Sequence, residues 1–410
     1  MSTHARQHFP TGFLWGAATA AHQIEGNNVH SDWWAAEQEG RLPYRSGSAC
    51  DSWNRWRDDI GLLDKIGLNA YRFSIEWARI EPEPGRFDQQ AIDTYRKQVE
   101  AMKEAGVEPL VTLHHFTHPL WLEREDGWRT PNIVDRLAVY TDTVARNIGD
   151  LITWWVTINE PSILAPKMYL EGAWPPQRPG DLRGYARTLR HAAFAHGAMR
   201  QIIKSHNPAA RASIAFAIWP LQPVRRWNPI DRAMVRLGDW LWQGRVLRRT
   251  QHLLDWVGVN YYSRVRVGWP PERVDAALDP HAGAGDRTDY GWEIYPPGLY
   301  DVLMRAGRYG KPVVITENGI SDAEDTKRAA YLVSHLQQVQ RAIADGVDVR
   351  GYMHWSLMDN FEWADGFTQR FGLAHVNFTT FERTLRPSAQ VYAEIARAND
   401  LPENPLALPR

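Results

Sequence analysis

The chain has 410 residues, 44% of them hydrophobic and 23% charged, and a formal net charge of −1. This composition is typical of a globular protein with ample apolar material for a core, and its neutrality argues against nucleic acid or a membrane surface as the main partner. The single cysteine, Cys50, excludes an intrachain disulfide framework and favours a reducing compartment.

Residues 13–21 superficially resemble the apolar part of a signal peptide. Pro10 and Gly12 interrupt any continuous helix before them, and the polar residues 22–26, which we interpret as a strand that delivers side chains, follow at once. No apolar stretch approaches the roughly 20 residues that a membrane-spanning helix needs. We therefore predict a cytoplasmic protein without a membrane partner.

From residue 13 onward, short apolar runs alternate with amphipathic segments. The apolar runs predict strands at residues 13–18, 70–75, 108–114, 154–158, 212–217, 255–260 and 349–354, and one more that ends at Glu317. Helical periodicity predicts helices at residues 51–66, 89–105, 133–148, 185–205, 226–250, 297–309, 326–344 and 388–398. Residues 266–290 are rich in Pro, Gly, Asp and Ala, which predicts a long loop near the site.

This alternation of eight strands with eight helices predicts an α/β fold, a (β/α)8 TIM barrel, as a single domain over residues 1–410 with its core at about 9–398. A doubly wound open sheet of similar length is the alternative. The glycine-rich phosphate turn that such a sheet would use for a dinucleotide is missing, because residues 12–16 have the wrong spacing and no P-loop pattern occurs.

Two of the predicted strands end in a glutamate. Glu317 closes the run Lys311-Pro-Val-Val-Ile-Thr-Glu, and Glu160 closes the run Thr153-Trp-Trp-Val-Thr-Ile-Asn-Glu. Either alone is explained as an incidental loop glutamate. As a pair on strand ends they suggest acid/base or nucleophilic work on a substrate that lies between them.

In a barrel, the carboxyl ends of the strands converge on one face. The polar or aromatic residues predicted there are Gln23, Arg72, His115, Asn159, Glu160, Asn260, Tyr262, Glu317 and Trp355. Single residues have simpler explanations: Gln23 could cap a loop, Arg72 could pair with Glu76, and Trp355 could belong to the core. The clustering of so many polar residues at strand ends indicates a functional site.

Six stretches carry a family resemblance. They are His22-Gln-Ile-Glu-Gly, Asn69-Ala-Tyr-Arg-Phe-Ser, Thr157-Ile-Asn-Glu-Pro, Val259-Asn-Tyr-Tyr, Ile315-Thr-Glu-Asn-Gly and Trp355-Ser-Leu-Met-Asp-Asn-Phe-Glu-Trp. In this order they resemble the successive signatures of the family 1 glycoside hydrolases, the β-glucosidase family, from about residue 9 to residue 387. The resemblance implies the barrel, a retaining mechanism and no cofactor.

By this resemblance, Glu317 is the nucleophile, Glu160 the acid and then the base, and Arg72 the arginine beside Glu317. We expect Pro161 to hold Glu160 in an extended backbone and the apolar Trp154 and Trp155 to raise the pKa of its carboxyl group. A retaining mechanism predicts a separation of roughly 5–5.5 Å between the two carboxyl groups.

The resemblance also implies which residues hold the sugar: Gln23, His115, Asn159, Trp355, Glu362 and Trp363, with Asn159 near the 2-hydroxyl, Tyr262 next to Glu317 and Asn260 in support. Glu362 would accept hydrogen bonds from uncharged hydroxyls and repel a 6-phosphate, which disfavours phospho-glycosides. The expected activity is a retaining exo-β-glycosidase, a β-glucosidase that also accepts β-galactosides or β-fucosides, acting on small β-glycosides or oligosaccharides.

Several alternatives remain open. A β-galactosidase, a β-fucosidase or a transglycosylase of the same family shares these residues, and a non-catalytic sugar-binding protein would lack one of the two glutamates. His114, His115 and His118 suggest a metal only weakly, since strand alternation sends the first two to opposite faces and no further ligand motif occurs. Against the family pattern, His22, Ile158 and Glu76 replace commoner residues. The chain is also shorter than most members of this family around residues 223–254 and in the loop after Tyr262, and these positions border the entrance for the leaving group, so the preferred leaving group stays open.

Overall fold

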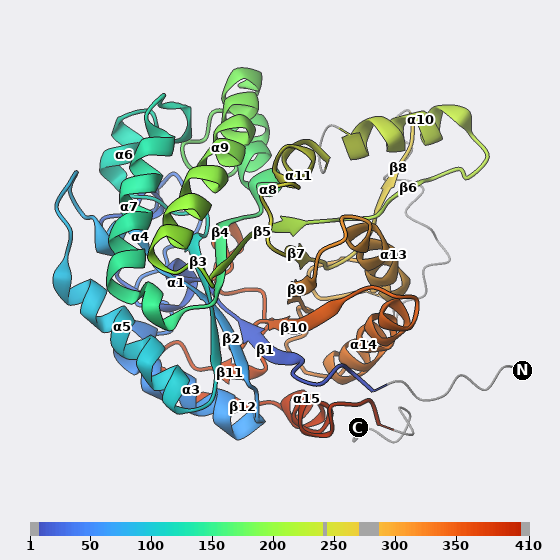
Figure 1. Cartoon of the computed structure of the whole chain (residues 1–410). Coiled ribbons are helices and arrows are strands. Elements are labelled where there is room, and N and C mark those ends of the chain that lie inside the picture. Colours follow the sequence, from blue (N-terminus) through green and yellow to red (C-terminus); the bar gives the residue numbers. More distant parts are fainter. Residues whose placement is uncertain (1–7, 241–243, 270–286, 403–410) are drawn as a thin grey trace, which may run out of the picture.

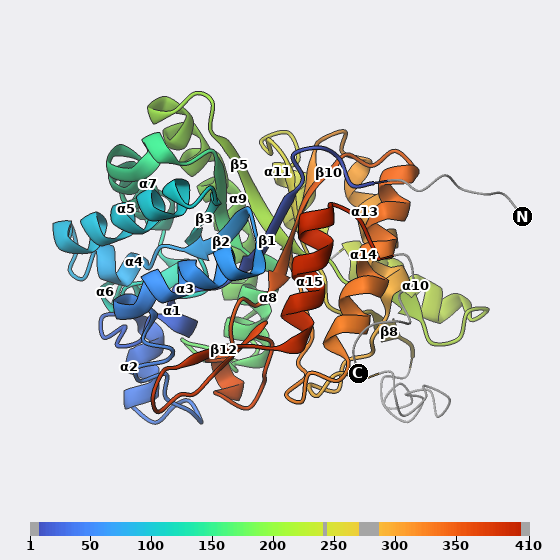
Figure 2. The ribbon, with the colours of Figure 1, turned by 90° about the horizontal axis from the view of Figure 1, so that it is seen from below.

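The structure is a computed structural model that describes residues 8–240, 244–269 and 287–402. Eight parallel strands close into a barrel, and helices surround it (Figures 1 and 2). In their order around the barrel, the strands are β1 (Leu14–Ala18), β2 (Ala70–Ser74), β3 (Glu108–His114), β4 (Trp154–Asn159), β5 (Arg211–Ala217), β7 (Val257–Asn260), β9 (Val313–Asn318) and β10 (Val349–Trp355), which pairs with β1.

The long helices lie between successive strands and pack on the outside of the barrel. They are α3 (Ser52–Ile66), α5 (Gln89–Glu104), α7 (Ile133–Ile148), α9 (Leu182–His206), α13 (Pro296–Gly307), α14 (Arg328–Ala344) and α15 (Pro387–Ala398), with the shorter α11 (Gly244–Thr250) before β7. The strand-to-helix loops carry α1 (Ala21–Ile24), α2 (Asp32–Gln38), α4 (Trp77–Ile80), α6 (Leu120–Arg124), α8 (Pro161–Pro166), α10 (Pro229–Gly238) and the two-stranded sheets β6–β8 (Leu221–Pro223, Val265–Val267) and β11–β12 (Ala374–Val376, Arg383–Leu385).

Helix α7 illustrates why these helices cover the barrel. Its apolar residues recur at spacings of three and four, so they form one stripe, and Ile133, Leu137, Val144 and Ile148 are fully buried on it. Tyr140 lies on the same stripe and donates its hydroxyl to the backbone oxygens of residues 75 and 113 at the ends of two strands. The burial of this apolar stripe and the two hydrogen bonds of the Tyr140 hydroxyl together position the helix on the outside of the barrel.

The predicted TIM barrel is confirmed, with every barrel strand within a few residues of its expected position. One local prediction is wrong: residues 22–26 are not a strand, because the chain turns into the short helix α1 directly after β1. Residues 226–250, predicted as one helix, contain α10 and α11, and residues 241–243 between them lie outside the described residues.

Most of the predicted loop at residues 266–290 also lies outside the described residues, because residues 270–286 are not among them. Among the described helices, none combines the length and apolarity that a membrane crossing requires.

Candidate active site

A pocket of about 310 Å³ opens at the carboxyl ends of the strands. Seven predicted site residues line it: His115, Glu160, Tyr262, Glu317, Trp355, Glu362 and Trp363. The other four, Gln23, Arg72, Asn159 and Asn260, hydrogen-bond to members of this set. The fold therefore brings all the predicted site residues together.

Glu317, near the end of β9, accepts hydrogen bonds from two side chains. Nη1 of Arg72 donates to its Oε1 over 2.5 Å, and the Tyr262 hydroxyl donates to its Oε2 over 2.7 Å. The two donors fix the orientation of this carboxyl group, because each of its oxygens has its own partner. Arg72 thus pairs with Glu317 and not with Glu76, whose oxygens accept from Ala78 N–H and the Thr117 hydroxyl.

Gly319, two residues after Glu317, allows the chain at the end of β9 to approach the end of β10. A side chain at Gly319 would place its first carbon 1.7 Å from the backbone oxygen of Trp355, so no other residue fits there without moving the chain. The ends of β9 and β10 therefore approach each other closely. This contact holds Glu317 and Trp355 on the same wall of the pocket.

Glu160 lies between the end of β4 and the start of α8, and its backbone differs from our prediction. Its φ of 42° and ψ of 57° are left-handed and not extended. The reason is that Pro161 already begins the helix, so the chain must turn from strand to helix within one residue. Left-handed backbone is costly for a residue with a side chain, and such strain is found where the surroundings fix a functional group.

The carboxyl group of Glu160 has a pKa raised to about 8 by burial and by the nearby negative charge of Glu317, against the opposing hydrogen bond from Asn260. We expected Trp154 and Trp155 to cause this shift. Both lie at the amino end of β4, away from Glu160, and Trp154 packs on Trp256. The carboxyl group of Glu160 is therefore largely protonated near pH 7.

A chain of hydrogen bonds connects the two glutamates behind the pocket. Nδ2 of Asn260 donates to Glu160 Oε1 over 2.8 Å and to Asn159 Oδ1 over 3.2 Å, and Arg72 Nη2 donates to the same Asn159 oxygen over 2.7 Å. These two donors orient the Asn159 amide, so its nitrogen faces His115 Nε2 at 3.2 Å. Burial, together with the charge of Arg72, keeps the pKa of His115 well below its usual value, so the ring is neutral.

Gln23 and Glu362 form the inner corner of the pocket. Nε2 of Gln23, on α1, lies within hydrogen-bond distance of Asn360 Oδ1, the Phe361 oxygen and Glu362 Oε2. Burial, and the charges of Asp365 and Glu317, raise the pKa of Glu362 to about 8. This carboxyl group is thus largely protonated at pH 7 in the described structure, and the argument that its charge repels a 6-phosphate is weakened.

Aromatic rings form the walls. Trp363, with a φ of 50°, stacks parallel to His22 at 5.6 Å and packs against Trp33, Phe116 and Trp174. Most of the residues on the outer wall were not predicted: Phe116, Ile163, Trp174, Trp219, Tyr290, Trp292 and Phe371. The chain is rich in tryptophan, with 20 in all, but these residues lie in loops whose paths no periodicity predicts.

The comparisons with known proteins agree with this geometry. The family model described as glycosyl hydrolase family 1 matches residues 5–244 and 243–401. The chain belongs to glycosyl hydrolase family 1. This family 1 enzyme is 33% identical to β-glucosidase A of Acetivibrio thermocellus, over 95% of this chain and 98% of that protein, and 33% identical to a bifunctional β-D-glucosidase/β-D-fucosidase of Bifidobacterium breve, over 94% and 97%.

Among solved structures, the family 1 enzyme is similar to a β-glycosidase from Pyrococcus horikoshii, with 38% identity, a TM-score of 0.90 and 98% of each chain covered. Matches over nearly the whole length of both chains show that the similarity extends over the entire barrel. The protein is therefore a glycoside hydrolase.

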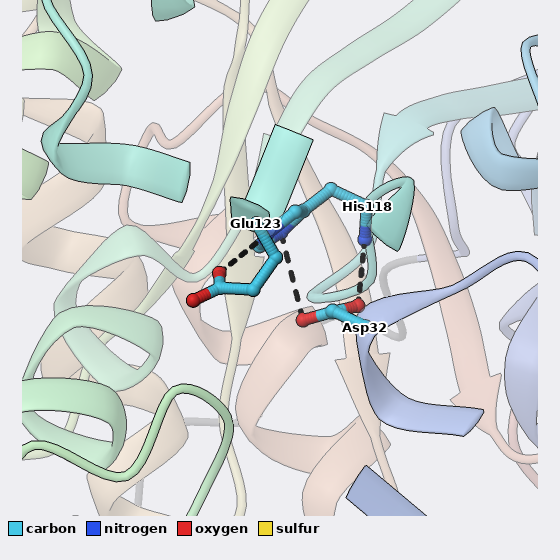
Figure 3. A group of neighbouring side chains, drawn as sticks. All are labelled: Asp32, His118 and Glu123. Atoms are coloured by element: carbon cyan, nitrogen blue, oxygen red, sulfur yellow. Dashed lines mark hydrogen bonds and ion pairs between the residues drawn. The ribbon is translucent and has the colours of Figure 1, made fainter. Parts of the chain in front are cut away.

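Asp32, His118 and Glu123 of the family 1 enzyme do not line the pocket, and they offer ligand atoms within 4.8 Å of one another (Figure 3). The two ring nitrogens of His118 face different carboxyl groups: Nε2 lies 3.0 Å from Glu123, and Nδ1 lies 3.7 Å from Asp32. A single cation can bind only one ring nitrogen, so this arrangement suits a protonated imidazole between two carboxylates better than a metal ion. The predicted absence of a metal remains a prediction.

The charge on His118 leads to a stability prediction. Burial opposes its protonation, but Asp32 and Glu123 outweigh burial and raise the pKa of the ring. A raised pKa stabilises the fold below the unfolded value of about 6.5, and this contribution is lost as the pH rises through the folded value. We expect His118→Asn to lower the free energy of unfolding by about 3 kcal/mol at pH 6, with a clearly smaller effect at pH 9.

Urea denaturation at the two pH values measures this difference, with His375→Asn, at an exposed position on β11, as the matched control. Equal losses at pH 6 and pH 9 would show that His118 is neutral in the folded protein.

Proposed function

We propose that this family 1 enzyme is a retaining exo-β-glycosidase, a β-glucosidase that removes terminal β-D-glucosyl units from the non-reducing ends of small β-glycosides and oligosaccharides. One observation carries the proposal. A single pocket holds a carboxylate that accepts bonds from Arg72 and Tyr262, and a second carboxyl group, Glu160, that is protonated at pH 7. A carboxyl group held by two donors beside a second one that carries a proton suits nucleophilic attack by the first and proton donation by the second.

In the first step, an oxygen of Glu317 attacks the anomeric carbon while the bond from that carbon to the leaving oxygen breaks. Glu160 gives its proton to the leaving oxygen, and the glucosyl unit is then an ester of Glu317. In the second step, Glu160, now ionised, takes a proton from water as the water oxygen attacks the anomeric carbon and Glu317 leaves. Two inversions at the same carbon retain its configuration.

Arg72 and Tyr262 have a specific part in this cycle. While Glu317 is a carboxylate, both donate to it, and they hold the attacking oxygen in place. When Glu317 becomes an ester its charge disappears, so the electrostatic cause that raises the pKa of Glu160 weakens, and Glu160 ionises more readily for the second step. The geometry thus supports one glutamate acting first as acid and then as base.

The inner corner supports recognition of an unsubstituted sugar end. Gln23 and Glu362 are buried together there, and they can exchange hydrogen bonds with sugar hydroxyls. Trp355 and Trp363 offer flat faces for the pyranose ring. The activity named for the relative from Bifidobacterium breve supports β-fucosides as further substrates, and β-galactosides differ from glucosides only in the orientation of one hydroxyl.

The experiment that tests the mechanism is proton NMR of the sugar first released from p-nitrophenyl β-D-glucoside. A retaining enzyme releases the β-anomer first, which then equilibrates with the α-anomer; initial release of the α-anomer would contradict the assignment. Values of kcat/KM for the β-glucoside, β-galactoside and β-fucoside rank the sugars, and added alcohol acceptors measure transglycosylation. A sugar-binding protein without activity would release no nitrophenol.

The place of action and the domain organisation belong to the same proposal. The only thiol, on Cys50, is buried and free, which suits the cytoplasm. Because all the site residues come from one barrel, the chain is proposed to act as a single catalytic domain.

A further inference from the structure

Helix α10 lies outside the ring of helices that covers the barrel (Figures 1 and 2). It packs on the small β6–β8 sheet, where Leu221 contacts Gly238 and the buried Asp231 accepts from the backbone N–H of Trp269. Trp219 and Val265, at the two ends of this extension, line the active-site pocket. The extension is therefore attached to the outer wall of that pocket.

The outward side of this extension is apolar. Ten large hydrophobic side chains are exposed in the described part of the chain, and five of them belong to this extension: Trp227, Ile230, Leu237, Trp240 and Trp269. Trp227 is 92% exposed and the other four are each about half exposed. Half of the exposed large apolar side chains are thus concentrated in one small part of the surface.

The spacing of these residues makes them a continuous stripe. Ile230, Ala233, Leu237 and Trp240 follow one another at intervals of three, four and three, so they lie on one face of a helix. Asp231 and Val235, which pack toward β6 and β8, lie on the opposite face. The helix is therefore apolar on the side that faces solvent, which is the reverse of an ordinary surface helix.

Arginines flank this stripe. Residues 221–250 contain seven arginines, two aspartates and neither lysine nor glutamate. Both aspartates already have partners, since Asp231 pairs with Arg225 and Asp239 pairs with Arg305. Arg226, Arg232 and Arg236 are exposed and form no ion pair with any described acidic residue. The surface around the stripe is therefore strongly cationic, although the whole chain has a net charge of −1.

From this combination we infer that the stripe on α10, with Trp227 and its flanking arginines, is a docking surface for an anionic lipid bilayer. A helix with tryptophan and aliphatic residues on one face and arginines beside them lies in the plane of the membrane interface, with its apolar face in the acyl boundary and its arginines at the phosphates. A second copy of the chain is disfavoured as the partner, because pairing the stripe with itself would bring the two sets of arginines together. The inference is independent of the proposed substrate.

The test is co-sedimentation of the full-length protein with vesicles of phosphatidylcholine alone or of equal parts phosphatidylcholine and phosphatidylglycerol. We expect preferential binding to the anionic vesicles that weakens with added salt. Ile230→Ser/Leu237→Ser should lower the partition coefficient about tenfold or more, since one leucine-sized apolar contact is worth about this factor. Arg232→Gln/Arg236→Gln should remove most of the preference for anionic vesicles.

Matched controls are Val139→Ser on α7 and Leu182→Ser on α9, which remove apolar side chains that are exposed at least as much as Leu237 but lie elsewhere. Both should bind vesicles like the unchanged protein, and every variant should hydrolyse p-nitrophenyl β-D-glucoside at the normal rate. Equal binding to both vesicle types at low salt, or unchanged binding by Ile230→Ser/Leu237→Ser, would overturn the inference. So would light scattering that shows a dimer which this double variant dissociates, because the stripe would then be a contact between two copies.

Discussion

Glu317→Ala is expected to reduce kcat for p-nitrophenyl β-D-glucoside on the order of 10⁵-fold, the scale of loss when a covalent nucleophile is removed. The fold should be retained, because Arg72 keeps its bonds to Asn159 and to the Thr316 oxygen when the carboxylate is removed. Residual rates are measured with a highly purified sample, and circular dichroism checks the fold.

Rescue of Glu317→Ala by formate tests the nucleophile most directly. The alanine leaves a space beside Arg72 and Tyr262 that a small carboxylate can fill, and formate there can attack the anomeric carbon in place of Glu317. We expect partial recovery of nitrophenol release with formate, and none when the same salt is added as chloride. Glu382→Ala, at an exposed position before β12, is the matched control and should keep full activity. Substantial turnover by Glu317→Ala without formate would rule out the assigned nucleophile.

Glu160→Ala is expected to separate substrates by their leaving groups. An alkyl glucoside needs the proton that Glu160 supplies, so its kcat/KM should fall about 10²–10⁴-fold. A dinitrophenyl glucoside, whose leaving group departs without a proton, should lose far less in kcat/KM. Comparable losses for both substrates would contradict the acid role.

The dependence of kcat/KM on pH provides a second test of the acid role of Glu160. Glu160 must be protonated to act as the acid, and its pKa of about 8 means that the fraction of active enzyme falls as the pH rises through 8. The unchanged enzyme should therefore lose kcat/KM for alkyl glucosides on the alkaline side. In Glu160→Ala, the part of the limb near pH 8 that Glu160 causes should be absent for the dinitrophenyl substrate. Glu362, with a similar pKa, still titrates in this variant, and Glu362→Gln distinguishes its contribution.

Much of the fold could be predicted from the sequence because barrel strands buried on both sides are short apolar runs, and helices that cover them have apolar residues every three or four positions. Val313, Val314 and Ile315 in β9 are all fully buried, as their β-branched side chains predict. The errors were local. Gln23 lies on the short helix α1, and Glu160 has a left-handed backbone, because such turns depend on contacts distant in sequence.

The sequence by itself determined the barrel, the two glutamates and the polar residues at the strand ends, since periodicity and strand-end position are local properties of the chain. Only the tertiary structure decided the partners and protonation of these groups. The pKa of Glu160 depends on its burial and on Glu317, which is far away along the chain. Arg72 pairs with Glu317 and not with Glu76, although Glu76 is much closer in sequence. Likewise, the seven arginines of residues 221–250 are visible in the sequence, but only folding leaves the apolar face of α10 exposed and brings Trp269 next to it.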